Sequence, residues 1–225
     1  MEQIIRMGTR PSQLAIKQVE EIQRRLPNFK LEPVIILTQG DRDKTTPFSR
    51  VEGSDFFTRE IEGALLNGGI DAAVHSAKDL EEIMPVQLTI AAITTSISPY
   101  ECLVSREGKK LNELPQGARV GTSSRKRKEA LMRYRPDLRI CDMRGNVEER
   151  LQQLDEGSFD AIIMAHAALI RLGYENRITE IISPEIIPPH PLQGSLAVQV
   201  RTGDRKMRSL FSVLDIRKER LQYEN

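Results

Sequence analysis

Apolar and polar positions follow two different spacings along the chain, and these spacings predict strands and helices in turn. Gln3–Thr9 is a short apolar run that predicts a buried strand. Gln13–Leu26 instead has apolar residues three and four positions apart, the spacing of an amphipathic helix. Lys30–Thr38 is apolar again and predicts a second strand. Such an alternation of strands and helices predicts a mostly parallel sheet with helices on its faces.

The alternation continues to the end of the chain. Further strands are predicted at Ile70–Val74, Gln87–Thr94, Glu101–Ser105, Ala118–Thr122, Leu138–Asp142, Asp160–Ala165 and Ser195–Arg201. Further helices are predicted at Phe56–Asn67, Ser124–Tyr134, Val147–Glu156 and Ala167–Leu172, with a last helix that ends at Leu214. Gln39–Ser54 is polar and lacks periodicity, so we expect a long, mobile loop there, either functional or a disordered insertion.

Two changes of composition divide the chain into domains. Thr94–Pro99 turns to Thr, Ser and Pro, which is typical of a hinge, and Ile186–Pro191 is a second, proline-rich crossing. A strand at Ser195–Arg201 that rejoins the first domain gives an α/β fold of two domains connected twice, with a cleft between their sheets. We expect domain 1 at residues 1–95 and 194–214, domain 2 at 98–190, and a charged, exposed tail at 215–225.

Composition narrows the class of protein. The chain has 225 residues, a net charge of +1, no Trp and 4% aromatic residues, which argues against a nucleic-acid surface. No apolar run approaches the ~18 residues that span a membrane, and we see no signal-peptide pattern. We therefore expect a cytoplasmic protein, or an organelle protein without its targeting segment. The histidines are scattered, which predicts no metal site, and Cys102 and Cys141 are expected to be reduced, buried thiols.

Basic residues gather where predicted strands give way to helices. Thr122 and Ser124 precede a helix whose first turn holds Lys126 and Arg127. The N–H groups of a helix start, together with hydroxyl groups, form a site for anions. Arginine adds forked, bidentate recognition of carboxylates. This segment is therefore a candidate anion site.

Two other segments repeat this arrangement. Arg144 lies at the end of a predicted strand, with Arg150 about a turn and a half later, and Arg10 with Ser12 follows the first strand. Ligands of open α/β sheets bind beyond the carboxyl ends of the strands, so these cations can converge on one ligand with several carboxylates or phosphates. The alternative is an ordinary run of solvated surface charge.

One acid lies among these cations. Lys78 and Asp79 follow the buried strand that ends near His75. An ionised carboxylate in that turn can stabilise a developing positive charge or move a proton, but it can equally be a helix cap or a surface ion pair. His75 is expected to be a packed, hydrogen-bonded residue.

A set of motifs in a fixed order resembles one family of enzymes. The motifs are MGTRPSQLA, FFTREIEGALL, DAAVHSAKDL, ARVGTSSRKRK, PDLRICDMRGNVEERLQQLDEG, FDAIIMAHAALIRLG and PLQGSLAVQVR, and they cover residues 4–212. Together they resemble porphobilinogen deaminase, also called hydroxymethylbilane synthase. The resemblance implies the doubly connected fold of type II periplasmic binding proteins, and condensation of porphobilinogen into a linear tetrapyrrole in porphyrin and heme biosynthesis, with loss of ammonia.

The resemblance also assigns roles to residues. Asp79 matches the catalytic aspartate, which contacts pyrrole nitrogens and stabilises the cationic azafulvene, and Lys78 matches its basic neighbour. Positions that bind cofactor or substrate carboxylates, or line the cleft, are matched by Arg10, Ser12, Thr122, Ser124, Lys126, Arg127, Arg144, Arg150, Gln193 and Gly194.

The family's cofactor is a dipyrromethane primer, which a cysteine of a third domain holds through a thioether. The chain ends at Asn225, and neither Cys102 nor Cys141 matches the anchoring position, so we expect no covalent anchor here. A partner chain that supplies the third domain is one expectation, and a monomer is another. The ligand is expected to be porphobilinogen or a related pyrrole carboxylate.

Three positions depart from the family's pattern. Lys126 stands where an arginine is usual, Ser54-Asp55 replaces a Lys-Gly pair, and Glu81 replaces a proline. Asp55 would place a negative charge near a site for carboxylates. These departures support a second interpretation, a non-catalytic or altered-activity protein that binds a pyrrole or another polycarboxylate.

Overall fold

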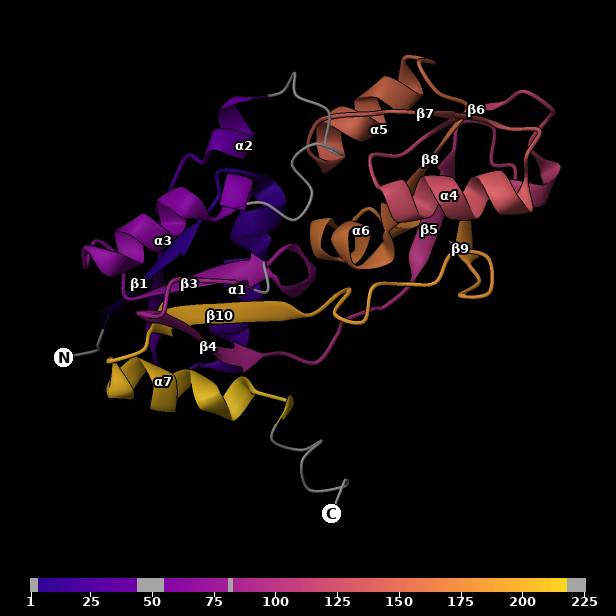
Figure 1. Cartoon of the computed structure of the whole chain (residues 1–225). Helices are drawn as coiled ribbons and strands as arrows, with labels where there is room; N and C mark the ends of the chain where they lie inside the picture. The colour runs from indigo at the N-terminus through magenta and orange to yellow at the C-terminus, as the bar shows by residue number, and fades with distance from the viewer. Residues whose placement is uncertain (1–3, 44–54, 81–82, 218–225) are drawn as a thin grey trace. The chain divides into compact units, whose positions relative to one another are not determined.

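The computed structural model describes residues 4–43, 55–80 and 83–217, and this part of the chain forms two compact units (Figure 1). Unit 1 comprises the described residues of 4–43, 55–97 and 195–217, and unit 2 comprises residues 98–194. The chain therefore passes from unit 1 into unit 2 and returns.

Unit 1 is built on a mixed sheet. Its strands are β1 (Ile4–Thr9), β2 (Lys30–Ile35), β3 (Ala72–Ser76), β4 (Leu88–Ile93) and β10 (Leu196–Arg201), in the order β2-β1-β3-β10-β4. β1 is parallel to β2 and β3, whereas β10 is antiparallel to both of its neighbours, so the sheet is mostly parallel, as expected, and of its five strands β10 runs the other way. The reason is that β10 enters where β3 ends, as the hydrogen bond from Ala77 N to Ser195 O (3.0 Å) shows, and then runs back along it.

Helices cover both faces of this sheet. α1 (Gln13–Arg25) and α7 (Arg205–Phe211) pack on one face, and α3 (Arg59–Leu66) packs on the other. The first cluster includes Val19, Ile22, Val74, Val198, Met207 and Phe211, and the second includes Ile61, Leu65, Ile70 and Ala73. Neighbouring residues of a strand point to opposite faces, which is why Ala73 and Val74 belong to different clusters.

Unit 2 repeats the arrangement. Its strands are β5 (Glu101–Ser105), β6 (Arg119–Gly121), β7 (Arg139–Cys141), β8 (Ala161–Ala165) and β9 (Glu180–Ile182), in the order β7-β6-β8-β5-β9. β5, like β10, lies one place from the sheet edge and is antiparallel to both neighbours. The sequence pattern does not predict β9, a strand of three residues.

The helices of unit 2 are α4 (Arg125–Tyr134), α5 (Val147–Asp155) and α6 (His166–Leu172). Short 3₁₀ helices at Leu111–Glu113 and Glu175–Arg177 complete it; unit 1 has others at Asp55–Phe57, Ala77–Asp79 and Ser212–Leu214. Across the described ranges of both units, none of the helices has the length and apolar character needed to cross a membrane.

Local capping groups fix where the helices begin and end. Ser12 Oγ accepts a hydrogen bond from Ala15 N (3.2 Å) at the start of α1. Asn146 and Glu149 form a reciprocal capping box at the start of α5, with both bonds at 2.8 Å. Gly173, with a φ of 74°, ends α6 in the left-handed conformation that favours glycine.

The expected loop after the second strand is partly wrong. Residues Gln39–Arg42 form a one-turn helix, α2, with a capping box between Thr38 and Asp41. The T-x-x-D pattern is the sequence signal for such a helix start, but a loop was predicted because the segment is polar and lacks periodicity. The rest of the predicted mobile loop, residues 44–54, lies outside the described residues.

The start of the predicted tail is not a free end. Ile93 N donates to Asp215 Oδ1 (3.0 Å), and Ile216 N donates to Ile93 O (3.0 Å), so these residues add to the hydrogen bonds at the β4 edge. Residues 218–225 lie outside the described range.

Helix α7 is needed to complete the core of unit 1. Phe211 is fully buried in the cluster shared with α1 and β10, so Phe211→Ala is expected to lower the free energy of unfolding by about 3–5 kcal/mol in urea titrations. Val213→Ala, at a side chain 74% exposed, is the control and is expected to change it by less than about 0.5 kcal/mol. Equal losses in the two variants would show that α7 does not stabilise unit 1.

Candidate functional site

The polar turn of unit 1 directly follows its central strand. β3 ends at Ser76, and the 3₁₀ helix Ala77–Asp79 places Lys78 partly buried and Asp79 exposed. The hydrogen bond from Ala77 N to Ser195 O ties the turn to the start of β10. Asp79 is thus an accessible carboxylate on a turn whose base is anchored in the sheet.

Arg10 follows the neighbouring parallel strand β1. Its Nε and Nη2 atoms bind Asp41 Oδ1 at 3.1 and 2.5 Å, and its guanidinium lies 4.4 Å from the centre of the Phe57 ring. Ser12, also predicted to bind a ligand, caps α1. Unit 1 therefore brings Arg10, Lys78 and Asp79 to the ends of adjacent strands.

His75, the last buried residue of β3, belongs to a chain of polar side chains. Its Nε2 lies 3.1 Å from Gln199 Oε1, and Gln199 Nε2 donates to Glu62 Oε1 at 2.8 Å. A carboxylate only accepts, so the Gln199 amide turns its oxygen to His75, and His75 must carry its proton on Nε2. This confirms the expectation of a packed, hydrogen-bonded histidine.

The same burial keeps His75 neutral. Loss of hydration lowers its pKa to about 4, and the positive charge of Arg10 acts in the same direction. The hydrogen bond with Gln199 and the charge of Asp79 oppose this shift without reversing it. The charges of Arg10 and Asp79 therefore both affect the pKa of His75.

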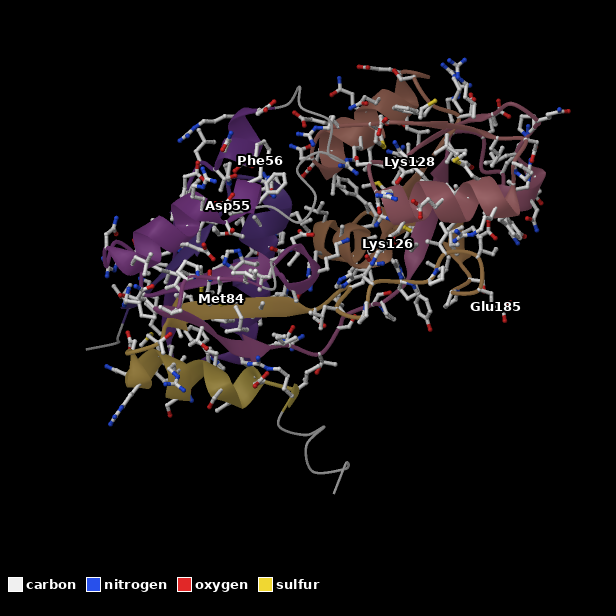
Figure 2. The ribbon with its side chains drawn as sticks, viewed as in Figure 1. Asp55, Phe56, Met84, Lys126, Lys128 and Glu185 are labelled. Atoms are coloured by element: carbon white, nitrogen blue, oxygen red, sulfur yellow. The ribbon has the colours of Figure 1, made fainter. Side chains whose placement is uncertain are left out.

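In unit 2 the predicted anion site lies between β6 and α4. Thr122 is fully buried, and its Oγ1 accepts a long hydrogen bond from Ser124 N (3.4 Å). Figure 2 shows Lys126 and Lys128 on different sides of α4, as expected for residues two positions apart. Lys128 pairs with Asp142, whereas Lys126 is exposed and pairs with no residue of the described part.

Arg127 points into unit 2 rather than to solvent. Only 8% of the residue is exposed, its Nη2 binds Glu101 Oε2 at 2.7 Å, and its Nη1 contacts Ile163 O at 3.4 Å. The sequence analysis did not single out Glu101. A charged residue at the start of an otherwise apolar strand was the available signal for a buried partner.

Arg144 and Arg150 complete the basic cluster of unit 2. Arg150 Nε donates to Gly145 O at 2.8 Å. Burial, followed by the charges of Arg127 and Arg144, lowers the pKa of Arg150 to about 10, although Glu149 opposes the shift. The three arginines are therefore close enough to repel one another, which is the property of a site prepared for anions.

Gln193 and Gly194 lie at the return crossing. Gln193 is 1% exposed, and its Nε2 donates to Pro99 O (3.1 Å) and Tyr100 O (3.2 Å) of the first crossing. Arg171, which the sequence analysis also passed over, donates to Gly194 O at 2.7 Å. These contacts hold together the two segments that link unit 2 to the rest of the chain.

Other predicted features have simpler outcomes. Asp55 accepts hydrogen bonds from Arg59 at 2.5 and 2.9 Å, while Ser54 and Glu81 lie outside the described residues. Cys102 is buried, and burial raises its pKa to about 12, whereas Cys141 is only partly buried. Within the described ranges, no three His, Cys, Asp or Glu residues are grouped as metal ligands.

Solved structures identify the fold class. A putative methionine-binding lipoprotein from Bacillus subtilis superposes with a TM-score of 0.55 at 14% identity, over 96% of this chain and 91% of that one. A periplasmic substrate-binding protein of an ABC transporter from Coxiella burnetii gives a TM-score of 0.53 at 16% identity, over 93% and 91%. The chain therefore has the two-domain α/β fold of periplasmic binding proteins, as predicted.

Sequence relatives identify the family. The family model described as "Porphobilinogen deaminase, dipyromethane cofactor binding domain" matches residues 5–209. Porphobilinogen deaminase of Syntrophobacter fumaroxidans is 41% identical over 217 residues, 95% of this chain and 70% of that protein. The enzyme of Dichelobacter nodosus is 45% identical over 201 residues, 88% of this chain and 66% of that protein. The chain belongs to the porphobilinogen deaminase family and spans about two thirds of these relatives' length.

Neutral His75 makes the stability of unit 1 depend on pH. Its pKa is about 4 when folded and about 6.5 when unfolded, so between these values the unfolded chain binds more protons. Stability is full above pH 6.5 and falls toward pH 4, by roughly 3 kcal/mol from this residue alone. His75→Gln is expected to remove that part of the loss, measured by urea unfolding at several pH values.

The control for this prediction is His166→Gln. The pKa of His166 is also lowered by burial, but the side chain is only partly buried, so its contribution is expected to be smaller. A wild-type loss that is unchanged in His75→Gln would mean that His75 is not the group that titrates.

Proposed function

We propose that this chain is a porphobilinogen deaminase that condenses porphobilinogen into a linear tetrapyrrole with release of ammonia. The observation that carries the proposal is the pairing of family membership with an exposed Asp79 at the end of β3. The chemistry of the substrate requires a carboxylate near the ring. When ammonia leaves, the pyrrole ring supplies electrons and becomes positive, and a fixed carboxylate lowers the energy of that charge.

The arginines have a different task in this proposal. Porphobilinogen carries an acetate and a propionate group, so every added ring brings two more carboxylates. Arg144 and Arg150 offer positive charge for them, and Arg10 offers the part of its guanidinium that Asp41 leaves open. Lys78, which follows β3, and Lys126, in the first turn of α4, supply point charges. Arg127 acts by its charge, since its fork is held by Glu101.

The residues of unit 2 also fit the family's cofactor. A dipyrromethane has four carboxylates, and Arg150, whose pKa is lowered by burial and by the charges of Arg127 and Arg144, is stabilised as a cation by an anion beside it. We propose that Thr122, Ser124, Arg144 and Arg150 hold these carboxylates. When bound, the cofactor supplies the terminal pyrrole from which the growing chain extends.

The anchoring of that cofactor has its own test. Cys102 is fully buried with a pKa of about 12, and Cys141 Sγ donates to Arg139 O at 3.5 Å, so we propose that neither thiol forms the thioether. The intact mass of the purified chain is expected to be that of the unmodified sequence. An added mass that disappears in Cys141→Ser would contradict this and identify the anchor.

The catalytic role of Asp79 predicts a large loss on substitution. In the purified chain with porphobilinogen and a supplied dipyrromethane, Asp79→Asn is expected to slow ammonia release by about a hundredfold or more, because the neutral amide cannot balance the charge on the ring. Glu20→Gln, an equal change of charge at an exposed residue of α1, is the control and should leave the rate unchanged.

Calorimetry separates the outcomes. Binding of porphobilinogen without ammonia release in the wild-type chain would favour a binding protein over the enzyme, and absence of both would overturn the proposal. The interdomain cleft, the monomeric state, a partner chain and the cytoplasmic location stay predictions from the sequence.

A further inference from the structure

Asp41 makes an unusual number of contacts for a residue with no assigned role. Its carboxylate accepts hydrogen bonds from Arg10 Nε and Nη2, from Thr38 Oγ1 at 2.7 Å and from Thr38 N at 3.0 Å. The side chain is 10% exposed. Burial alone would raise the pKa of this carboxyl, but the bonds from Arg10 and Thr38, with the charge of Arg10, outweigh it and lower the pKa. Asp41 is therefore a partly buried, ionised acid with several hydrogen-bond donors around it.

These bonds occupy one edge of the Arg10 guanidinium. The edge formed by Nε and Nη2 faces Asp41, and the ring of Phe57 lies 4.4 Å away. A guanidinium has five N–H groups in a planar fork. Within the described ranges, no hydrogen bond occupies Nη1 or the outer N–H of Nη2, which form a second edge of the same plane and match another carboxylate.

The surroundings of Asp41 hold this geometry in place. Thr38 is fully buried and caps the single turn of α2 through Asp41. A Cβ atom built on Gly40 would lie 2.0 Å from a Phe57 ring atom, so the turn and the ring meet closely only because residue 40 is glycine. The acid, the aromatic ring and the arginine therefore form one closely packed group.

We propose that Asp41 is the positioning residue that fixes Arg10 and turns its Nη1 edge toward a carboxylate of the substrate. The inference rests on the proposed function, in which Arg10 binds such a carboxylate. It predicts the opposite sign from simple electrostatics. If Asp41 only neutralised Arg10, its removal would strengthen the binding of an anion; if Asp41 positions Arg10, its removal weakens it.

Calorimetry with porphobilinogen on the full chain tests the sign. Asp41→Asn is expected to raise the Kd about tenfold, equivalent to about 1.4 kcal/mol. In an Arg10→Gln background the same substitution is expected to have no further effect, because Asp41 acts through Arg10. A purely structural role would weaken binding equally in both backgrounds, so equal effects overturn the proposal.

Two further variants keep the test decisive. Thr38→Val keeps the side-chain shape and removes one hydrogen bond to Asp41, so it should weaken binding in the same direction by a smaller factor. Asp71→Asn is the matched control, because Asp71 forms an equivalent fork with Arg6 just before β3 and should leave the Kd unchanged.

The outcomes distinguish the two proposals. A wild-type chain that does not bind porphobilinogen overturns the proposed function and this inference with it. Binding that is unchanged or tighter in Asp41→Asn overturns the inference alone.

Discussion

Repulsion among arginines is the constraint on which the chemistry of unit 2 depends. Burial, followed by the charges of Arg127 and Arg144, lowers the pKa of Arg150. The fold tolerates this because Glu101 neutralises Arg127 and the carbonyl of Gly145 accepts from Arg150. A carboxylate bound beside these arginines opposes their repulsion.

Unit 1 differs from unit 2, because Arg10, the arginine that follows β1, is already paired with an acid. Arg10 is bound by Asp41, and nearby His75 is kept neutral by burial and by Gln199. A neutral histidine adds no competing charge beside Asp79. Asp79 is thus an accessible carboxylate near a neutral histidine, which suits a site where positive charge develops only during the reaction.

The sequence was sufficient where the signal is local. The helices α1 and α5 were predicted well because Ser12 and Asn146 cap them, and β5 was predicted to the residue because its apolar run is continuous. The partners of the site residues were missed. Arg10 and Asp41 are 31 positions apart, and His75 and Gln199 are 124 apart, so no periodicity or motif connects them. The antiparallel course of β10 was missed for the same reason, since it depends on where the chain re-enters the sheet.

The position of β10 also sets an order of events during synthesis. In the described part of the chain, unit 2 is the segment of residues 98–194, and all of its strands are made before β10. The sheet of unit 1 cannot join β3 to β4 until Leu196–Arg201 has been translated, because β10 lies between them. Domains fold as units while the chain emerges from the ribosome. Unit 2 is therefore able to fold first. The sheet of unit 1 is completed only after β10, which lies more than a hundred residues beyond β3, has been translated.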